Sequence, residues 1–547
     1  MIKKLLSIIF TLAASLSAAS QDRVFVITDR PAYIAGDIVG CSVFCAGAYG
    51  HPEAFSSICY LELIGEGGTA AEAKISLLDG RGAGSFRIPD KTPTGNYSLV
   101  AYTSRNAHSP EASRRIAVFN TTSTSRAANG VVVSDESDYQ PHYIPEGSST
   151  GGLRMSMGGS PAPLGQAVLS LEGLDEDADL AISVFHDDGL DAGDGKTLAG
   201  FAAGSGDAVS TGDSGEYEGE TIRVTVEGLT SDEASLGDKM VILSTPGSPS
   251  EVYIGRITSD GHVDFITNNI YGDREIVCEV TSMRGKSCHI SVSSPFRHPA
   301  PEALPPLELN PAQRAALIAR KAALAARKGV AADTLVSFLP KREGLLLEAL
   351  PCVHYHLDDY SRFPTVKEMC VEFINELRFM DNNNGSRLRM FVSDAGGSRK
   401  YAGDNVLVMM DGVVLTDHGM LDDFDAMLLE DVYIYPQTVM ISGIPFNGVV
   451  NFVSKNNYVT GLHFPPNVRV MDFKGASYPV CYTGGRPSGD KDLRQVLYWH
   501  PAFEAKSGTK NEITLEMPGY KGRFKAVAEG WKRGGIPIRA EYTFEIQ

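Results

Sequence analysis

The chain has 547 residues, more than one hydrophobic core normally organises, so several domains are expected. It carries 67 acidic and 49 basic side chains, a formal net charge of −18 at pH 7. This acidic balance argues against nucleic acid and anionic lipid as partners, because both attract basic surfaces.

The first twenty residues have the layout of a signal peptide. Two lysines open the segment, an apolar run extends from Leu5 to Leu16, and small residues precede Gln21. The run is too short to cross a bilayer, which takes about 20 apolar residues, and no later stretch supplies one. We therefore expect residues 1–20 to be removed, leaving an exported chain without a transmembrane segment, in the periplasm or associated with the outer membrane.

Residues 21–120 predict a β-sandwich. Apolar and polar side chains alternate in short runs broken by Gly, Pro, Asn and Asp, as in antiparallel strands. Two motifs are more specific: TDRPAY at 28–33 with GD at 36–37, and GNYSLVAYT at 95–103. Pro31 suits a strand edge, and the GD pair suits a tight turn. These motifs resemble the second macroglobulin domain of the alpha-2-macroglobulin family, which implies a macroglobulin-like sandwich.

Strand patterning resumes after a Ser/Thr/Asn-rich stretch at 120–129. We predict a second sandwich over 130–215 and a third over 216–297, with the alternative that both share one core. The Gly/Asp/Ser-rich segment 187–215 is predicted to be a long exposed loop. It is acidic enough to attract calcium, but its spacing does not fit the EF-hand pattern, and a solvated loop is the better interpretation.

One cysteine pair can be argued from spacing. Cys278 and Cys288 flank Met283 between two β-rich runs, so a hairpin centred on Met283 would place the two sulfurs opposite each other. Export would allow such a bond to persist. Cys278 and Cys288 are therefore the candidate disulfide, while spacing alone assigns no other pair.

Residues 298–345 predict a Pro-rich linker and a connector helix. Asn310 is placed to cap a helix with Pro311 at its first position, and the Ala/Arg/Lys/Leu run ends near Lys328 with Gly329 beyond it. Few large apolar residues occur in it, which favours a partly exposed connector, with docking against a neighbouring domain left open.

Residues 346–458 alternate helix and strand signals: a helix over 366–377, an extended run over 387–392 and a buried strand over 406–410. The run VLVMMDGVV at 406–414 looks like the strand and turn of TonB-dependent receptor plug domains, and GIPFNGVVNFVSK at 443–455 resembles their closing glycine turn and strand. The resemblance implies an α/β plug-like domain.

The residues after Lys455 are too few for the many strands of about 9–11 residues that a transmembrane barrel needs. We instead predict a C-terminal sandwich over 459–547. The order of macroglobulin domain, plug-like domain and a closing sandwich with LYWHP at 497–501 resembles an envelope-protein family of Bacteroidota. That resemblance implies a multi-domain, mainly β protein with several immunoglobulin-like or macroglobulin-like sandwiches and one α/β plug-like domain.

The sequence contains no motif that points to catalysis. The Cys-Gly-Glu-Gln thioester of protease-trapping macroglobulins is missing, as is an HExxH zinc motif. His354 and His356, beside Asp358 and Asp359, have the chemistry of metal ligands, but a strand entering the plug-like domain is the better interpretation. We therefore expect no catalytic residue, no metal and no cofactor.

Two hypotheses follow from these patterns. In the first, the chain is a non-catalytic binding or scaffold protein whose plug-like domain docks to an outer-membrane protein or envelope complex. Its candidate contacts are turns containing Asp411, Gly412, Gly443 and Gly448, although a positive φ in a tight turn is the better explanation of these glycines. In the second, the chain is an envelope enzyme or protease-inhibitor-like protein with a site between domains.

Overall fold

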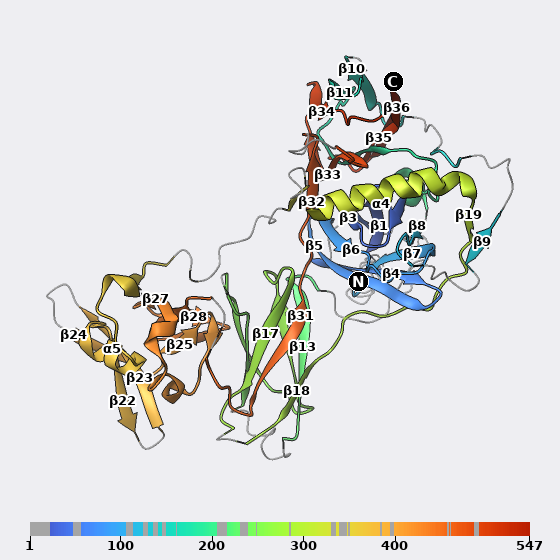
Figure 1. Cartoon of the computed structure of the whole chain (residues 1–547). Coiled ribbons are helices and arrows are strands. Elements are labelled where there is room, and N and C mark those ends of the chain that lie inside the picture. Colours follow the sequence, from blue (N-terminus) through green and yellow to red (C-terminus); the bar gives the residue numbers. More distant parts are fainter. Residues whose placement is uncertain are drawn as a thin grey trace, which may run out of the picture. The chain divides into compact units, whose positions relative to one another are not determined.

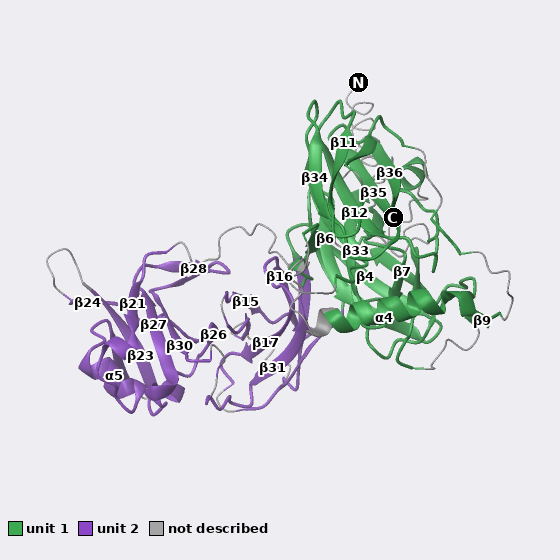
Figure 2. Cartoon of the chain, turned by 45° about the horizontal axis from the view of Figure 1, so that its top comes forward, with its two compact units in different colours: residues 1–219, 295–340, 476–547 green, residues 220–294, 341–475 purple. Residues whose placement is uncertain are grey.

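The computed structural model describes residues 22–547 apart from 48–55, 106–112, 124–129, 135–140, 145–148, 160, 205–215, 230–238, 248, 284–285, 330–334, 338–346, 348–349, 383–384, 394–398, 457–458, 460 and 486–491. The predicted signal peptide lies outside the described residues. The chain divides into two compact units, unit 1 (1–219, 295–340 and 476–547) and unit 2 (220–294 and 341–475) (Figure 2). Both are built mainly from β-strands, which confirms the predicted fold class.

Unit 1 begins with a sandwich over residues 22–119 (Figure 1). Its strands are β1 (Arg23–Thr28), β2 (Ala32–Ile34), β3 (Ile38–Ala46), β4 (Ile58–Gly65), β5 (Gly68–Leu78), β6 (Arg81–Arg87), β7 (Gly95–Tyr102) and β8 (Arg114–Phe119), in the spatial order β1-β3-β6-β5-β4-β7-β8-β2. In β1, Val24 and Val26 enter this sandwich's core, while Phe25 and Ile27 join a cluster shared with the second sandwich of unit 1. Burial on both faces explains why β1 is almost wholly apolar.

The TDRPAY and GD motifs form a buried polar corner. Asp29 accepts hydrogen bonds from the Tyr33 hydroxyl at 2.7 Å and from the Gly40 amide at 2.9 Å. The Arg30 guanidinium donates to Asp37 at 2.7 Å, and Arg30 and Asp37 are each only 3% exposed. The motif therefore ties β1, β2 and β3 together, because buried charges need partners.

The second sandwich of unit 1 combines distant parts of the chain. Its strands are β10 (Arg154–Gly158), β11 (Gln166–Glu172), β12 (Ala178–His186), β20 (Leu335–Ser337), β32 (Val480–Thr483), β33 (Val496–Ala505), β34 (Asn511–Glu516), β35 (Gly522–Lys532) and β36 (Pro537–Ile546), in sheets β10-β11-β34 and β20-β32-β33-β12-β35-β36. β12 pairs with β33 on one side and β35 on the other. The prediction of separate sandwiches at 130–215 and 459–547 is therefore wrong, since each segment supplies strands that the other needs.

The segment after β12 is packed rather than exposed. Asp188 receives two hydrogen bonds from Arg320, at 2.6 and 2.8 Å, and Leu190 and Leu198 are 2% and 0% exposed. Helix α2 (Leu198–Ala203) follows. The predicted exposed loop is thus wrong for most of residues 187–204, which arginine pairing and apolar contacts bury at least in part, although Gly195, Lys196 and Gly200 are exposed. Residues 205–215 lie outside the described residues.

The predicted connector helix docks onto the first sandwich (Figure 1). It consists of η2 (Pro311–Gln313) and α4 (Arg314–Gly329), with Asn310 and Gln313 forming a capping box. Leu324 packs in a cluster with Ile34 and Phe119. Just before the helix, the strand β19 (Leu307–Leu309) pairs in parallel with β9 (Val131–Val133). Of the alternatives left open by the sequence, docking is the one observed.

Unit 2 contains a third sandwich. Its strands are β13 (Glu220–Glu227), β14 (Met240–Ser244), β15 (Val252–Arg256), β16 (His262–Thr267), β17 (Asp273–Val280), β18 (His289–Val292) and β31 (Val468–Lys474), in sheets β16-β13-β18 and β15-β14-β17-β31. The sandwich is separate from the second one, which settles the alternative of a shared core. β31 comes from the predicted C-terminal domain, so the boundary at 459 is also wrong there.

The rest of unit 2 is an α/β part, defined here as residues 351–455. Its elements are β21 (Val353–His356), η3 (Leu357–Asp359), α5 (Val366–Glu372), β22 (Leu377–Asn382), β23 (Gly385–Ser393), β24 (Arg399–Gly403), β25 (Leu407–Met410), β26 (Val413–Val414), η4 (His418–Leu421), η5 (Ala426–Leu428), β27 (Leu429–Tyr435), β28 (Val439–Ile441), β29 (Ile444–Phe446) and β30 (Val449–Ser454). The main sheet has the order β21-β27-β30-β25-β26, with β25 and β30 parallel. The predicted helix ends at Glu372 rather than 377, because Leu377 already pairs with Met390.

Within unit 2, the α/β part and the third sandwich share an apolar interface. Ile242 and Ile254 of the sandwich cluster with Leu407, Met409 and Val449 of the main sheet. The two parts therefore form one unit. None of the helices in the described part of the chain combines the length and the apolar character that crossing a bilayer requires.

Glu279 at this interface gives unit 2 a measurable pH dependence. Burial raises its pKa to about 7, although Thr416 donates a hydrogen bond to the carboxylate. Since the folded pKa lies above the usual 4.5, ionisation destabilises the folded state as pH rises from about 4.5 to 7. Glu279→Gln should stabilise unit 2 by about 3 kcal/mol at pH 8 and by little below pH 4.5, measured by urea unfolding at both values. An equal effect at the two pH values would contradict this account.

Candidate functional site

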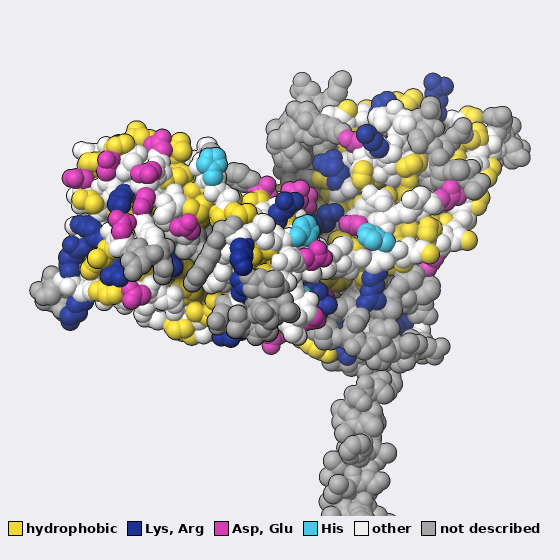
Figure 3. Space-filling view, turned by 90° about the horizontal axis from the view of Figure 1, so that it is seen from below, with side chains coloured by type: hydrophobic (Ala, Val, Ile, Leu, Met, Phe, Trp, Pro, Cys, Tyr) yellow, Lys and Arg dark blue, Asp and Glu magenta, His cyan; other side chains and the backbone are white. Residues whose placement is uncertain are grey.

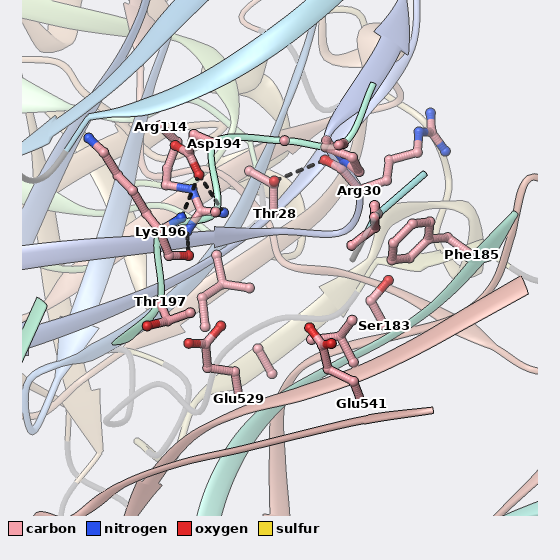
Figure 4. A pocket seen from close by; sticks show the side chains of 18 of the residues that line it. Thr28, Arg30, Arg114, Ser183, Phe185, Asp194, Lys196, Thr197, Glu529 and Glu541 are labelled. Carbon is pink, nitrogen blue, oxygen red and sulfur yellow. Dashed lines mark hydrogen bonds and ion pairs between the residues drawn. The ribbon is translucent and has the colours of Figure 1, made fainter. Parts of the chain in front are cut away.

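A cavity of about 350 Å³ lies within unit 1 (Figure 4). The first sandwich contributes Thr28 and Arg30, the segment 192–197 closes one side, and the second sandwich contributes Ser183 and Trp499. Pockets between packed domains are common ligand sites. The sequence analysis offered a site between domains only as its second hypothesis and assigned no residues to it.

One wall of the cavity is rich in paired charges. Arg115 makes a two-pronged ion pair with Asp191, at 2.7 and 3.1 Å. Arg114 lies 3.4 Å from Asp194, and the Lys196 ammonium donates to the backbone carbonyl of Ser113 at 2.6 Å. These contacts fix the acidic segment after β12 against β8, with Asp191 and Asp194 each paired with an arginine.

The facing wall carries two carboxylates on β35 and β36. Figure 4 shows Glu529 and Glu541 side by side, across the cavity from Arg114 and Lys196. Arg539 bridges them, and Glu541 also pairs with Lys525 at 2.9 Å. Although burial opposes ionisation, the hydrogen bond from Lys525 and the charge of Arg539 hold the pKa of Glu541 below its usual value. An ionised carboxylate held between two cations is not a general acid at neutral pH.

Two buried donors that line the cavity have no hydrogen-bond partner: Arg30 Nη1 and Trp499 Nε1. The Ser183 hydroxyl, in contrast, donates to the Asp29 backbone carbonyl at 2.5 Å, so its proton is already engaged. Both atoms are directed at the protein itself, since Arg30 Nη1 lies 3.7 Å from Asp29 Oδ2 and the Trp499 indole nitrogen packs on Gly40, so neither marks the cavity as a ligand site. Sequence reasoning missed it because its walls come from strands that are far apart in the chain and share no motif.

Asp411 and Gly412 were predicted as contact residues, but the structure places them inside unit 2. Asp411 is 2% exposed and accepts hydrogen bonds from the Ser454 amide and hydroxyl, both at 2.7 Å. A Cβ on Gly412 would lie 2.2 Å from the Ser250 side chain of the third sandwich. The turn between β25 and β26 is therefore occupied by its own chain and does not offer a free contact surface.

The other two predicted turn glycines differ from each other. Gly448 has φ +136°, and a Cβ there would meet the Met390 sulfur at 2.3 Å, so its role is close packing. Gly443 has φ +77° with nothing within 4 Å, in the exposed turn between β28 and β29. The structure brings none of the four residues together into one site beyond the Asp411-Gly412 turn itself.

The predicted disulfide is absent, because Cys278 and Cys288 are both free thiols. Cys278 lies on β17, which pairs with β14 and β31, whereas Cys288 precedes β18, which pairs with β13 in the other sheet. The two residues thus do not belong to one hairpin, and the premise of the prediction was wrong.

His354 and His356 converge on a carboxylate, but not on those of Asp358 and Asp359. Their ring nitrogens lie 2.8 and 2.9 Å from the same oxygen of Asp431 on β27. The hydrogen bond that the His356 ring donates to the Asp431 carboxylate raises the pKa of His356, so this histidine is favoured as a cation. The arrangement is an ion-pair network between paired strands.

No family model matches the sequence, and no curated protein matches it. Among solved structures, the chain is similar to Salmonella alpha-2-macroglobulin reacted with methylamine, at 10% identity and a TM-score of 0.24, covering 97% of this chain and 40% of that chain. Trypsin-activated alpha-2-macroglobulin from Escherichia coli gives 9% identity and a TM-score of 0.25, covering 96% and 41%. The chain thus spans about two fifths of the length of these structures, and at these TM-scores the likeness carries no argument about what it does.

Proposed function

We propose that this chain is an exported, non-catalytic binding or scaffold protein of a bacterial cell envelope, whose α/β part docks to an outer-membrane partner. The observation that carries the proposal is an exposed apolar patch around helix α5. The resemblance of this part to receptor plug domains supports the choice of an outer-membrane protein as partner.

The α5 patch is defined as Tyr360, Phe363, Val371, Phe373 and Met427. The rings of Tyr360 and Phe373 stack at 4.6 Å between centroids and 5° between planes. Tyr360, Val371 and Met427 are 41%, 55% and 46% exposed. Isolated surface apolar residues are ordinary, but aromatic and Met side chains are enriched in protein interfaces, and these residues lie on α5, in the segments that flank it, or next to Ala426, which is hydrogen-bonded to Pro364.

Two chain segments hold this patch in place. The Val366 amide donates to the Phe424 carbonyl at 3.1 Å, and the Ala426 amide donates to the Pro364 carbonyl at 3.1 Å. Arg362 adds hydrogen bonds to the carbonyls of Ala426 and Leu429. Figure 3 shows hydrophobic side chains exposed on the α/β part, at the left of the view. A patch fixed by backbone hydrogen bonds loses little conformational freedom on binding.

The scaffold role is supported by the contacts that join the two sandwiches of unit 1. Ion pairs and hydrogen bonds join its two sandwiches, for example from Ser42 to the Pro501 carbonyl at 2.7 Å and from Arg23 to the Phe201 carbonyl at 2.7 Å. Trp499 packs directly on Gly40, where a Cβ would lie 2.5 Å from the indole nitrogen. Such contacts make unit 1 a rigid support rather than a pair of hinged domains.

The test is a cross-linking pull-down from intact cells of the source organism, with mass spectrometry of the proteins retained. The double substitution Val371→Asp with Met427→Asp should abolish recovery of an outer-membrane partner, because it places two charges in the patch. Met440→Asp, also exposed at 54% and in the same α/β part, should leave recovery unchanged. Partner recovery that survives the double substitution would refute docking through this patch.

A further inference from the structure

Two glutamates face each other in unit 1 in a way that calls for a cation. Glu62 on β4 and Glu72 on β5 are direct cross-strand partners, and Glu62 is 0% exposed. Like charges opposite each other on paired strands destabilise a sheet. A positive group close to both carboxylates would offset this repulsion.

The group that the fold supplies is His298, from the segment that follows β18 as the chain returns to unit 1. Its Nδ1 atom lies 3.1 Å from Glu62 Oε2 and 3.5 Å from Glu72 Oε1. The Thr69 hydroxyl lies 3.0 Å from Glu62 Oε2 and 3.3 Å from the same Nδ1. His298 has φ +46°, an unusual backbone conformation for a residue with a side chain.

We propose that Glu62, Glu72 and His298 form a zinc site, with Thr69 or a water molecule as the fourth donor. Zinc bonds of about 2.0–2.2 Å to nitrogen and oxygen give a tetrahedron whose edges are about 3.3–3.6 Å. The separations of 3.0, 3.1, 3.3 and 3.5 Å among these donor atoms are close to such edges. One imidazole with two carboxylates suits zinc better than magnesium or calcium, which prefer oxygen alone.

The surroundings of Glu62 match those of a metal ligand. Its other oxygen, Oε1, accepts hydrogen bonds from the Tyr102 hydroxyl at 2.5 Å and from the backbone amides of Arg297 and His298 at 3.1 and 3.0 Å. These donors orient the carboxylate so that Oε2 faces His298 and Thr69, as outer contacts do in metal sites. The His298 side chain is 54% exposed, which leaves a path for the ion.

Zinc binding would link two segments that are far apart in the chain. The ion would tie the chain at His298 to the hairpin of β4 and β5, and so fix where the segment from Pro295 rejoins the first sandwich. Binding that occurs only in the folded state stabilises that state. The proposal does not depend on the α5 patch or on the identity of any partner.

The experiment titrates the purified, EDTA-treated mature chain with Zn²⁺ alone, in competition with a chromophoric chelator. The wild type should bind one zinc equivalent that is lost or weakened more than about 100-fold in Glu72→Gln and in His298→Ala. X-ray absorption should show a low-coordinate shell of nitrogen and oxygen at about 2.0–2.2 Å with no sulfur.

The matched control is His262→Ala, which removes a histidine paired with a single carboxylate, Asp260, at 3.1 Å. It should keep the zinc equivalent. Circular dichroism of the metal-free proteins checks folding, and Glu72→Gln, at a partly exposed position, covers the case in which His298→Ala misfolds. Equal zinc affinity in the wild type and both site variants, or no zinc bound by any of them, would overturn the proposal in favour of a cluster held by hydrogen bonds alone.

Discussion

Deletion of residues 476–547 should unfold the second sandwich of unit 1. β12 would lose β33 and β35, its neighbours on both sides, and β11 would lose β34. The inward face of β12, with Leu180, Ile182 and Val184 all 0% exposed, would then be open to water. A strand without its partners cannot keep its hydrogen bonds or its core, so residues 150–204 should become sensitive to protease.

Limited proteolysis with mass spectrometry measures this directly. Unit 2 provides the internal control, because its last strand, β31, ends at Lys474 and is retained. Residues 476–547 supplied as a separate polypeptide should restore protection of residues 150–204. Unchanged protection in the shortened chain would mean that 130–215 folds alone, as the sequence had indicated.

Asp37→Ala, which removes the Arg30–Asp37 pair, should lower the stability of unit 1 strongly. Asp37→Ala leaves the Arg30 guanidinium buried beside Asp29 at 3.7 Å but without its hydrogen-bonded partner. Breaking a buried pair from one side costs about 3–5 kcal/mol, because the remaining charge stays desolvated. Urea unfolding of unit 1 should show a loss of this size.

The surface pair Arg223 and Asp264 is the matched control. Its geometry is as good, with hydrogen bonds of 2.7 Å from two guanidinium nitrogens, but the side chains are 53% and 36% exposed. Asp264→Ala should therefore cost less than about 1 kcal/mol. Equal losses of stability for Asp37→Ala and Asp264→Ala would show that burial does not determine how much the Arg30–Asp37 pair stabilises unit 1.

Much of the local structure was predictable, while the pairing of distant strands was not. Alternation of apolar residues shows which face of β12 is buried, but it does not say which strand lies beside it. The sequence therefore predicted sandwiches over 130–215 and 459–547, and so placed β12 in one domain and its neighbours β33 and β35 in another. The predicted disulfide between Cys278 and Cys288 was wrong for the same reason, since two successive strands were assumed to pair.

The residues of the proposed zinc site were also not predictable from the sequence, because their proximity depends on strand register. A two-residue turn at Glu66-Gly67 would by itself place Glu62 opposite Ala71. A register shift between Leu63 and Ile64 brings Glu72 opposite instead. Such a bulge has no clear sequence signature, and His298 joins the pair from far along the chain.

The central claim, that the α5 patch contacts an outer-membrane partner, is tested most directly by photo-cross-linking in living cells. A photoreactive amino acid at position 371 should form an adduct with one outer-membrane protein, and the same residue at position 440 should not. Adducts at 371 with no outer-membrane protein, or identical adducts at both positions, would contradict the account.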